Sequence, residues 1–185
     1  MTGYAFCGSF CTFKESLITF SELLEKGYDL IPIMSENAYS TDTRFYKAED
    51  FKKTVSKLSG KEIVHTISEA EKFGANRLEN LIIAPCTGNT LAKIANGITD
   101  TSVTMAAKAH LRCDGKLLIA LASNDAMSQN LKNIASLLTR KSVYFVPMRQ
   151  DNPEGKPHSL VTDFSLLTKS FEAMENDIQM RPIFL

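Results

Sequence analysis

The chain has 185 residues, 44% of them hydrophobic, and its 21 Lys and Arg balance its 21 Asp and Glu. This length fits one domain over residues 1–185, with enough apolar residues for a core that needs neither metals nor disulfides. The zero net charge argues against nucleic-acid binding, which requires a strongly basic face. No leader pattern and no run of about 18 apolar residues is present, so we expect a cytoplasmic protein that contacts no membrane and keeps its cysteines as thiols.

Short apolar runs alternate with segments of helical spacing. In chain order, strands buried on both faces are predicted at residues 3–7, 30–34, 81–84, 117–121 and 143–146, with a weaker candidate at 62–67. Helices are predicted around residues 17–24, 51–58, 131–138 and 164–174, and Ser68 with Glu71 predicts a capping box. This alternation predicts a three-layer α/β sandwich with parallel strands and right-handed crossovers.

Two polar segments, residues 35–47 and 149–159, match no regular element. They follow the second and the fifth predicted strands. Open α/β sheets bind ligands at the carboxyl ends of their strands, so we expect both segments to be functional.

The first two strands each end in small polar residues. After the first, Gly8 allows a tight turn, Ser9 offers a hydroxyl, and the N–H groups of the next helix could face an anion. A plain turn in which Ser9 caps the helix fits equally well. Ser35 places a second hydroxyl at the same edge, where it is also ordinary turn chemistry. Neither a GxGxxG motif nor a Walker loop is present.

The segment after the third strand carries the strongest signal. Pro85 is expected to end strand pairing, and Gly88 allows close approach of the backbone. Thr87, Asn89 and Thr90 supply hydrogen-bonding groups at a helix start. A helix cap accounts for one such residue rather than three, so the pattern favours a polar ligand that carries a phosphate and hydroxyls.

The fourth strand ends at Ser123 and Asn124. Asn124 fits the N-cap of the following helix at least as well as a ligand contact. Its place beside the third segment favours binding.

Gly8-Ser9, Ser35 and the Ala-Pro-x-x-x-Asn-Thr segment at 84–90 resemble the flavoprotein superfamily of FMN-dependent cysteine decarboxylases and flavin prenyltransferases. The resemblance implies one Rossmann-like α/β/α domain whose first turn and third loop hold the FMN phosphate. It also implies a homo-oligomer with the flavin ring at an interface between copies of the chain. The residues it assigns to the cofactor are Gly8, Ser9, Ser35, Pro85, Thr87, Gly88, Asn89, Thr90, Ser123 and Asn124.

Within this superfamily, the sequence is similar in particular to the B subunit family of dipicolinate synthase from spore-forming bacteria. This similarity extends from the first predicted strand to the last five residues. It implies an oxidoreductase component of the sporulating mother cell that contributes to oxidation of dihydrodipicolinate to pyridine-2,6-dicarboxylate. The implied partner is the A subunit of dipicolinate synthase, which is of dehydrogenase type and binds NAD(P). The similar segments are residues 8–12, 40–45, 83–89, 105–109, 123–126, 150–153 and 181–185.

The sequence departs from the decarboxylases at two places. Residues 122–125 replace their Pro-x-Met-Asn segment, and His65, the counterpart of their histidine, lies 20 residues before Pro85. We expect His65 to be a structural strand residue. Decarboxylation is therefore disfavoured. Prenyl transfer is also disfavoured, because the arginine expected after the fourth strand is missing from this sequence.

A substrate with two carboxylates needs cations, and arginine grips carboxylates in bidentate fashion. Arg44 is the first candidate and Lys108 the second, whereas Arg112 fits a solvated surface cation. No residue is an obvious base, and the hydride acceptor is either a flavin here or a nicotinamide on the partner. Two alternatives stay open: a freestanding FMN-dependent decarboxylase, and a non-catalytic partner with a vestigial pocket.

Overall fold

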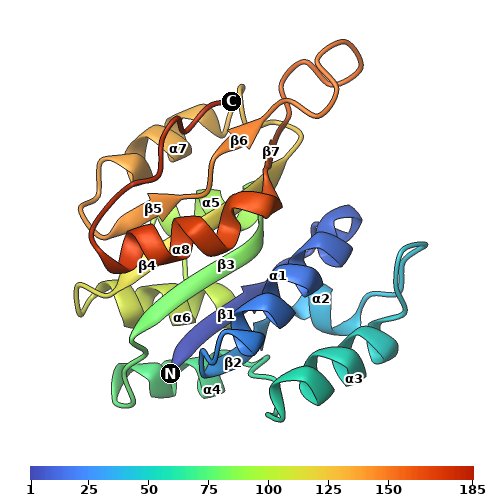
Figure 1. Cartoon of the computed structure of the whole chain (residues 1–185), viewed down its shortest axis with the longest axis vertical. Coiled ribbons are helices and arrows are strands. Elements are labelled where there is room, and N and C mark those ends of the chain that lie inside the picture. The colour runs from blue at the N-terminus through green and yellow to red at the C-terminus, as the bar shows by residue number, and fades with distance from the viewer.

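Five parallel strands position the site in the computed structural model, which describes residues 1–185. They lie in the order β2-β1-β3-β4, with β5 paired to the first half of β4. All five predicted strands are confirmed (Figure 1). Their bounds are β1 Thr2–Phe6, β2 Leu30–Met34, β3 Asn80–Thr87, β4 Lys116–Ser123 and β5 Val143–Phe145.

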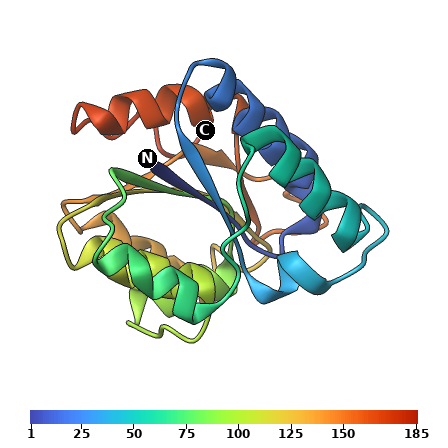
Figure 2. The ribbon, with the colours of Figure 1, turned by 90° about the horizontal axis from the view of Figure 1, so that it is seen from below.

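Helices cover both faces of this sheet, which confirms the three-layer α/β architecture (Figure 2). One face carries α1 (Phe13–Glu25), α3 (Ala48–Ser59) and α8 (Leu167–Glu175). The other face carries α4 (Ile67–Glu71), α5 (Gly88–Ala95), α6 (Ser102–Leu111) and α7 (Leu131–Leu138). The short elements are the 3-10 turns η1 Phe10–Thr12, η2 Lys72–Gly74 and η3 Phe164–Leu166, helix α2 Glu36–Ser40, and strands β6 Met148–Arg149 and β7 Leu160–Thr162.

The two helical layers use alternate residues of each strand. Tyr4 and Phe6 pack in the core on the α1 face, whereas Ala5 and Cys7 pack on the α6 face. This alternation explains why the strands are apolar throughout. Each fully buried aromatic side chain contributes about 1.5–3 kcal/mol by leaving water.

Two predictions between α3 and β3 are wrong. Residues 62–67 do not form a strand, and only Val64 makes an isolated bridge, to Ile33 of β2. The capping box uses Thr66 and Glu69 instead of Ser68 and Glu71. The Thr66 hydroxyl accepts a hydrogen bond from the Glu69 N–H while the Glu69 carboxylate accepts one from the Thr66 N–H, so the helix begins two residues earlier.

The two polar segments contain regular elements that are too short to show a period. Residues 36–40 form α2, and Ser35 is its N-cap. Arg149 lies in β6, and β7 pairs antiparallel both with β6 and with the end of β4. The sheet is therefore mainly, not wholly, parallel. None of the helices has the length and apolar character needed to cross a membrane.

Candidate functional site

The carboxyl ends of β1, β2, β3 and β4 meet at one edge of the sheet. Backbone hydrogen bonds join them beyond the regular ladder. The Ser35 N–H donates to the Phe6 carbonyl over 3.0 Å, and the Cys7 N–H donates to the Pro85 carbonyl over 3.1 Å. We call this region the strand-end edge, defined by the segments 7–9, 35–37, 85–90 and 123–125.

At the end of β1, the backbone turns close to α2. A Cβ built on Gly8 would lie 3.3 Å from the Cβ of Asn37 and 3.5 Å from the Phe10 ring, so a larger residue would crowd this turn. The Ser9 side chain makes no capping hydrogen bond. The capping interpretation of Ser9 is therefore wrong, and its hydroxyl is unpartnered at the edge.

The Ser35 hydroxyl oxygen accepts a hydrogen bond from the Ala38 N–H over 3.3 Å, which leaves its own proton free to donate. Close by, the Ser102 hydroxyl donates to the Met34 carbonyl over 2.6 Å and fixes the start of α6 to the end of β2. Sequence reasoning missed Ser102. The signal was the adjacent capping box of Thr101 and Thr104, which marks the beginning of α6.

Pro85 does not end strand pairing as predicted. The Ala84–Pro85 peptide bond is cis, and the register shifts between Ile83 and Cys86. Pairing with β4 then resumes at Cys86 and Thr87. Proline lacks an N–H but keeps its carbonyl, and here that carbonyl accepts from Cys7.

The start of α5 is a hydrogen-bonded cap. The Thr87 hydroxyl accepts from the Thr90 N–H and donates to the Thr90 hydroxyl, each over 3.1 Å. Thr90 is buried, and its hydroxyl donates to the Cys7 sulfur over 3.4 Å, so it faces the core instead of a ligand as expected. Asn89 is exposed, and the N–H groups of Gly88 and Asn89 have no acceptor within the helix.

Position 88 must be glycine, because side chains at and after the end of β4 leave no room for a Cβ. A Cβ on Gly88 would collide with the Ser123 hydroxyl and would lie 2.7 Å from Asn130 Nδ2 and 2.9 Å from Asp125 Oδ1. Ser123 donates to Asp125 over 2.5 Å, and Asn130 donates to both oxygens of that carboxylate. Hydrogen bonds from Ser123 and Asn130 lower the pKa of Asp125. Asn124 is exposed and caps no helix, because α7 begins at Leu131.

The strand-end edge is built mainly from hydroxyls, side-chain amides and backbone groups, and its segments carry two acidic residues, Glu36 and Asp125, and no Lys or Arg. Burial raises the pKa of the Cys7 thiol to about 11 and that of the Cys86 thiol well above its usual value. Both cysteines are therefore neutral at physiological pH. Such an edge suits a ligand held by many weak donors instead of one ion pair.

Arg44 and Lys108 lie apart from each other. Arg44 is exposed in the loop between α2 and α3, with its guanidinium 4.8 Å from the centre of the Phe45 ring. That loop and the loop between β6 and β7 both extend away from the sheet (Figure 1). Lys108 lines a separate hollow with Arg112 and Arg140. The structure therefore does not bring Lys108 to the strand-end edge.

His65 lies in a loop, so its expected place inside a strand is wrong. Its ring stacks on Tyr39 with centroids 3.9 Å apart, and its Nδ1 lies 3.5 Å from the Glu69 carboxylate. Lys52 Nζ lies 4.2 Å from the centre of the Tyr39 ring. These contacts give His65 packing partners from α2 and α4.

Comparison with known proteins gives consistent matches. Residues 3–165 match the family model described as Flavoprotein. The dipicolinate synthase B subunit of Bacillus subtilis (strain 168) is 35% identical over 99% of this chain and 92% of its own length. The crystal structure of the dipicolinate synthase B subunit from Bacillus halodurans C covers 100% of this chain and 95% of its own, with 35% identity and a TM-score of 0.91. A dodecameric FMN-dependent UbiX-like decarboxylase from Escherichia coli O157:H7 shares the fold, at 24% identity, 80% coverage of both chains and a TM-score of 0.63.

Proposed function

Because the chain belongs to the flavoprotein family, and within it to the B subunit family of dipicolinate synthase, we propose that it is the FMN-binding component of a two-component dipicolinate synthase. The reaction removes a hydride and a proton from dihydrodipicolinate and leaves aromatic pyridine-2,6-dicarboxylate. The observation that carries the proposal is the edge of hydroxyls and backbone N–H groups at four parallel strand ends, in a chain 35% identical to the Bacillus subtilis protein over nearly its whole length.

The donor set of the strand-end edge fits a flavin mononucleotide. The Ser9 hydroxyl, the free Ser35 proton and the first N–H groups of α5 are suited to phosphate oxygens. Pro85, Asn89 and Asn124 then border the rest of the cofactor. Bound FMN supplies a hydride acceptor.

Arg44 is our candidate for gripping a substrate carboxylate. It is exposed in a loop that follows β2 and α2, and its guanidinium forms no ion pair with an acidic residue of this chain. A planar guanidinium matches a carboxylate in bidentate geometry. Asp125 is unsuited as the base for the second proton, because the donors Ser123 and Asn130 hold its pKa below the usual value. Its role is to hold the ends of β4 and α7 together.

The partner in this proposal is the dehydrogenase-type A subunit with its nicotinamide cofactor, and the setting is the mother cell of a sporulating bacterium. Supporting observations are the two dipicolinate synthase matches over nearly all of the chain. We also propose that the chain forms a homo-oligomer. The fold is shared with a decarboxylase that is dodecameric.

The test is formation of pyridine-2,6-dicarboxylate from dihydrodipicolinate by the purified chain, by the dehydrogenase partner, and by their mixture with FMN. The proposal predicts that the mixture exceeds the sum of the separate activities, and a mixture equal to that sum would overturn it. A double change of Thr87→Val and Asn89→Ala should abolish most of the gain, because it removes the α5 cap and an exposed amide at the edge. Thr54→Val, an exposed position on α3, is the matched control. Full activity of the double variant would instead support a non-catalytic partner.

A further inference from the structure

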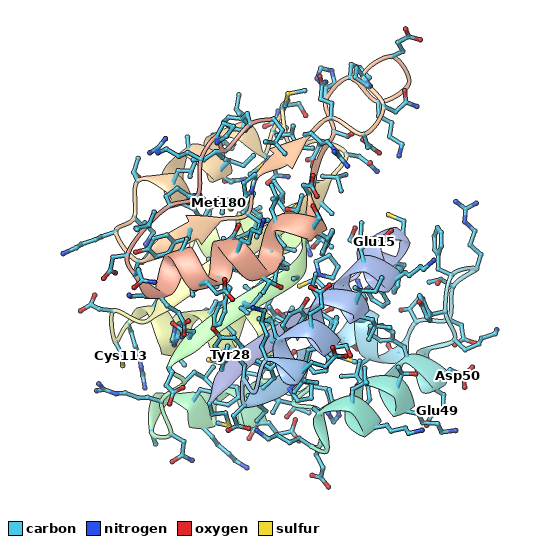
Figure 3. All side chains as sticks on the ribbon, in the orientation of Figure 1. Glu15, Tyr28, Glu49, Asp50, Cys113 and Met180 are labelled. Carbon is cyan, nitrogen blue, oxygen red and sulfur yellow. The ribbon has the colours of Figure 1, made fainter.

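A second charged hollow lies away from the strand-end edge, on the face of the sheet that carries α5, α6 and α7. Its volume is about 260 Å³. Cys113, the residue after the lining residue Arg112, is labelled in Figure 3. The lining comes from α5 and the loop after it, from α6 and the residue after it, and from the segment that follows α7: Ile94, Gly97, Ile98, Thr99, Thr104, Ala107, Lys108, Leu111, Arg112 and Arg140.

The charge of this hollow has one sign. Lys108, Arg112 and Arg140 line it, and no Asp or Glu does. Each of four other hollows on the molecule mixes acidic with basic side chains. None of the three cations forms an ion pair, although ten ion pairs exist elsewhere in the chain. The hollow is therefore lined by three exposed cations without an acidic side chain among its lining residues.

The rest of the lining gives the hollow an apolar floor and a neutral donor. Ile94, Ala107 and Leu111 are buried side chains at its base, and Thr99 is half-buried at its wall. The Arg112 guanidinium packs directly on Gly74 of η2, where any side chain would displace it. An apolar base together with three cations in the lining matches a ligand with an apolar body and negative groups at its edges.

We propose that this hollow binds a compact aromatic dicarboxylate, separately from the strand-end edge. The choice of pyridine-2,6-dicarboxylate as the occupant rests on the proposed function, whereas the preference for a flat dianion rests on the lining alone. Arg112 and Arg140 each carry a planar guanidinium that can take one carboxylate in bidentate fashion, and Lys108 adds a third positive charge to the lining. The flat ring then lies on the apolar floor.

The experiment is calorimetric titration of the purified full chain, without the dehydrogenase partner, against four probes. These are pyridine-2,6-dicarboxylate, benzene-1,3-dicarboxylate, pyridine-2-carboxylate and inorganic phosphate. Both dicarboxylates should bind at least about tenfold more tightly than the monocarboxylate and phosphate. Phosphate binding as tightly as the dicarboxylates would overturn the proposed ligand class.

Variants place the binding on the molecule. Lys108→Gln with Arg140→Gln should weaken dicarboxylate binding at least about tenfold, and Gly74→Ala should weaken it by displacing Arg112. Lys132→Gln, an exposed cation of α7 outside the hollow, is the matched control. Binding that survives the double change would refute the proposal, and its loss in Arg44→Gln would locate the ligand at the loop between α2 and α3 instead. The synthase assay tests the proposed function, whereas the titration of the chain alone tests this binding site. A negative result in one experiment therefore does not decide the other.

Discussion

The Thr90 hydroxyl donates a hydrogen bond to the Cys7 sulfur over 3.4 Å and thereby joins the first turn of α5 to the end of β1. Thr90 is also bonded to the Thr87 cap, so the two elements that frame the candidate cofactor site are held in one hydrogen-bonded chain. Cys7 accepts this bond as a buried, neutral thiol, because burial raises its pKa to about 11. Its role here is structural.

This relationship predicts the reactivity of the thiols. Titrated with a thiol reagent near neutral pH, the folded chain should expose Cys11 first and Cys113 more slowly, because Cys11 is exposed and Cys113 is half-buried. Cys7 and Cys86 should react only after unfolding. Cys11→Ser should remove the fast phase alone. Rapid modification of Cys7 in the folded chain would refute this assignment.

Gly88→Ala should destabilise the chain by about 1–3 kcal/mol, since its Cβ would overlap the cluster of Ser123, Asp125 and Asn130. Urea unfolding measures this loss. Gly97→Ala provides a contrast: it has open space around its Cβ, and its cost comes only from a φ of +73°. If Gly88→Ala binds FMN and unfolds like the unmodified chain, the cluster does not pack as described.

Ser9→Ala separates binding from stability. The Ser9 side chain makes no capping bond, so its removal should change the free energy of unfolding by less than about 0.5 kcal/mol. FMN affinity should fall about tenfold through the loss of one phosphate contact. Thr87→Val should lower both the free energy of unfolding and the FMN affinity, because the Thr87 hydroxyl caps α5. Unchanged FMN affinity in Ser9→Ala would remove Ser9 from the cofactor site.

The Glu69 carboxylate should make stability depend on acid pH. Hydrogen bonds from the His65 and Thr66 N–H groups lower its pKa from 4.5 to about 2. The unfolded chain binds this proton at the higher pH, so the stabilisation is complete above about pH 5 and declines toward pH 2. Glu69→Gln should remove that part of the pH dependence in urea unfolding. Glu71→Gln, a neighbouring carboxylate without a hydrogen-bonded donor, should keep the full dependence.

Much of the fold was predictable because the strands are buried on both faces. Their apolar runs and the glycines at 27 and 60, which both have positive φ, mark where strands and helices end. Strands β6 and β7 were missed, since two and three residues carry no readable period. The capping box was predicted two residues too late, because the Ser-x-x-Glu and Thr-x-x-Glu patterns overlap at residues 66–71.

The candidate site was predictable as a set of strand ends but not in the direction of each side chain. Thr90 and Asn89 are neighbours in the sequence, yet one faces the core and the other solvent, as the turn of a helix requires. Asp125 was missed because its contact with Gly88 joins segments far apart in the chain. Lys108 was expected at the strand ends. It lies in the second half of α6 and lines another hollow.

The most direct measurement of the central claim is titration of the purified, folded chain with FMN, followed by flavin fluorescence and absorbance. We predict saturable binding of one FMN per chain, a shifted flavin spectrum, and weaker binding in Ser9→Ala than in the Thr54→Val control. A chain that stays folded but takes up no FMN at saturating concentrations would contradict the assignment of the strand-end edge as a cofactor site.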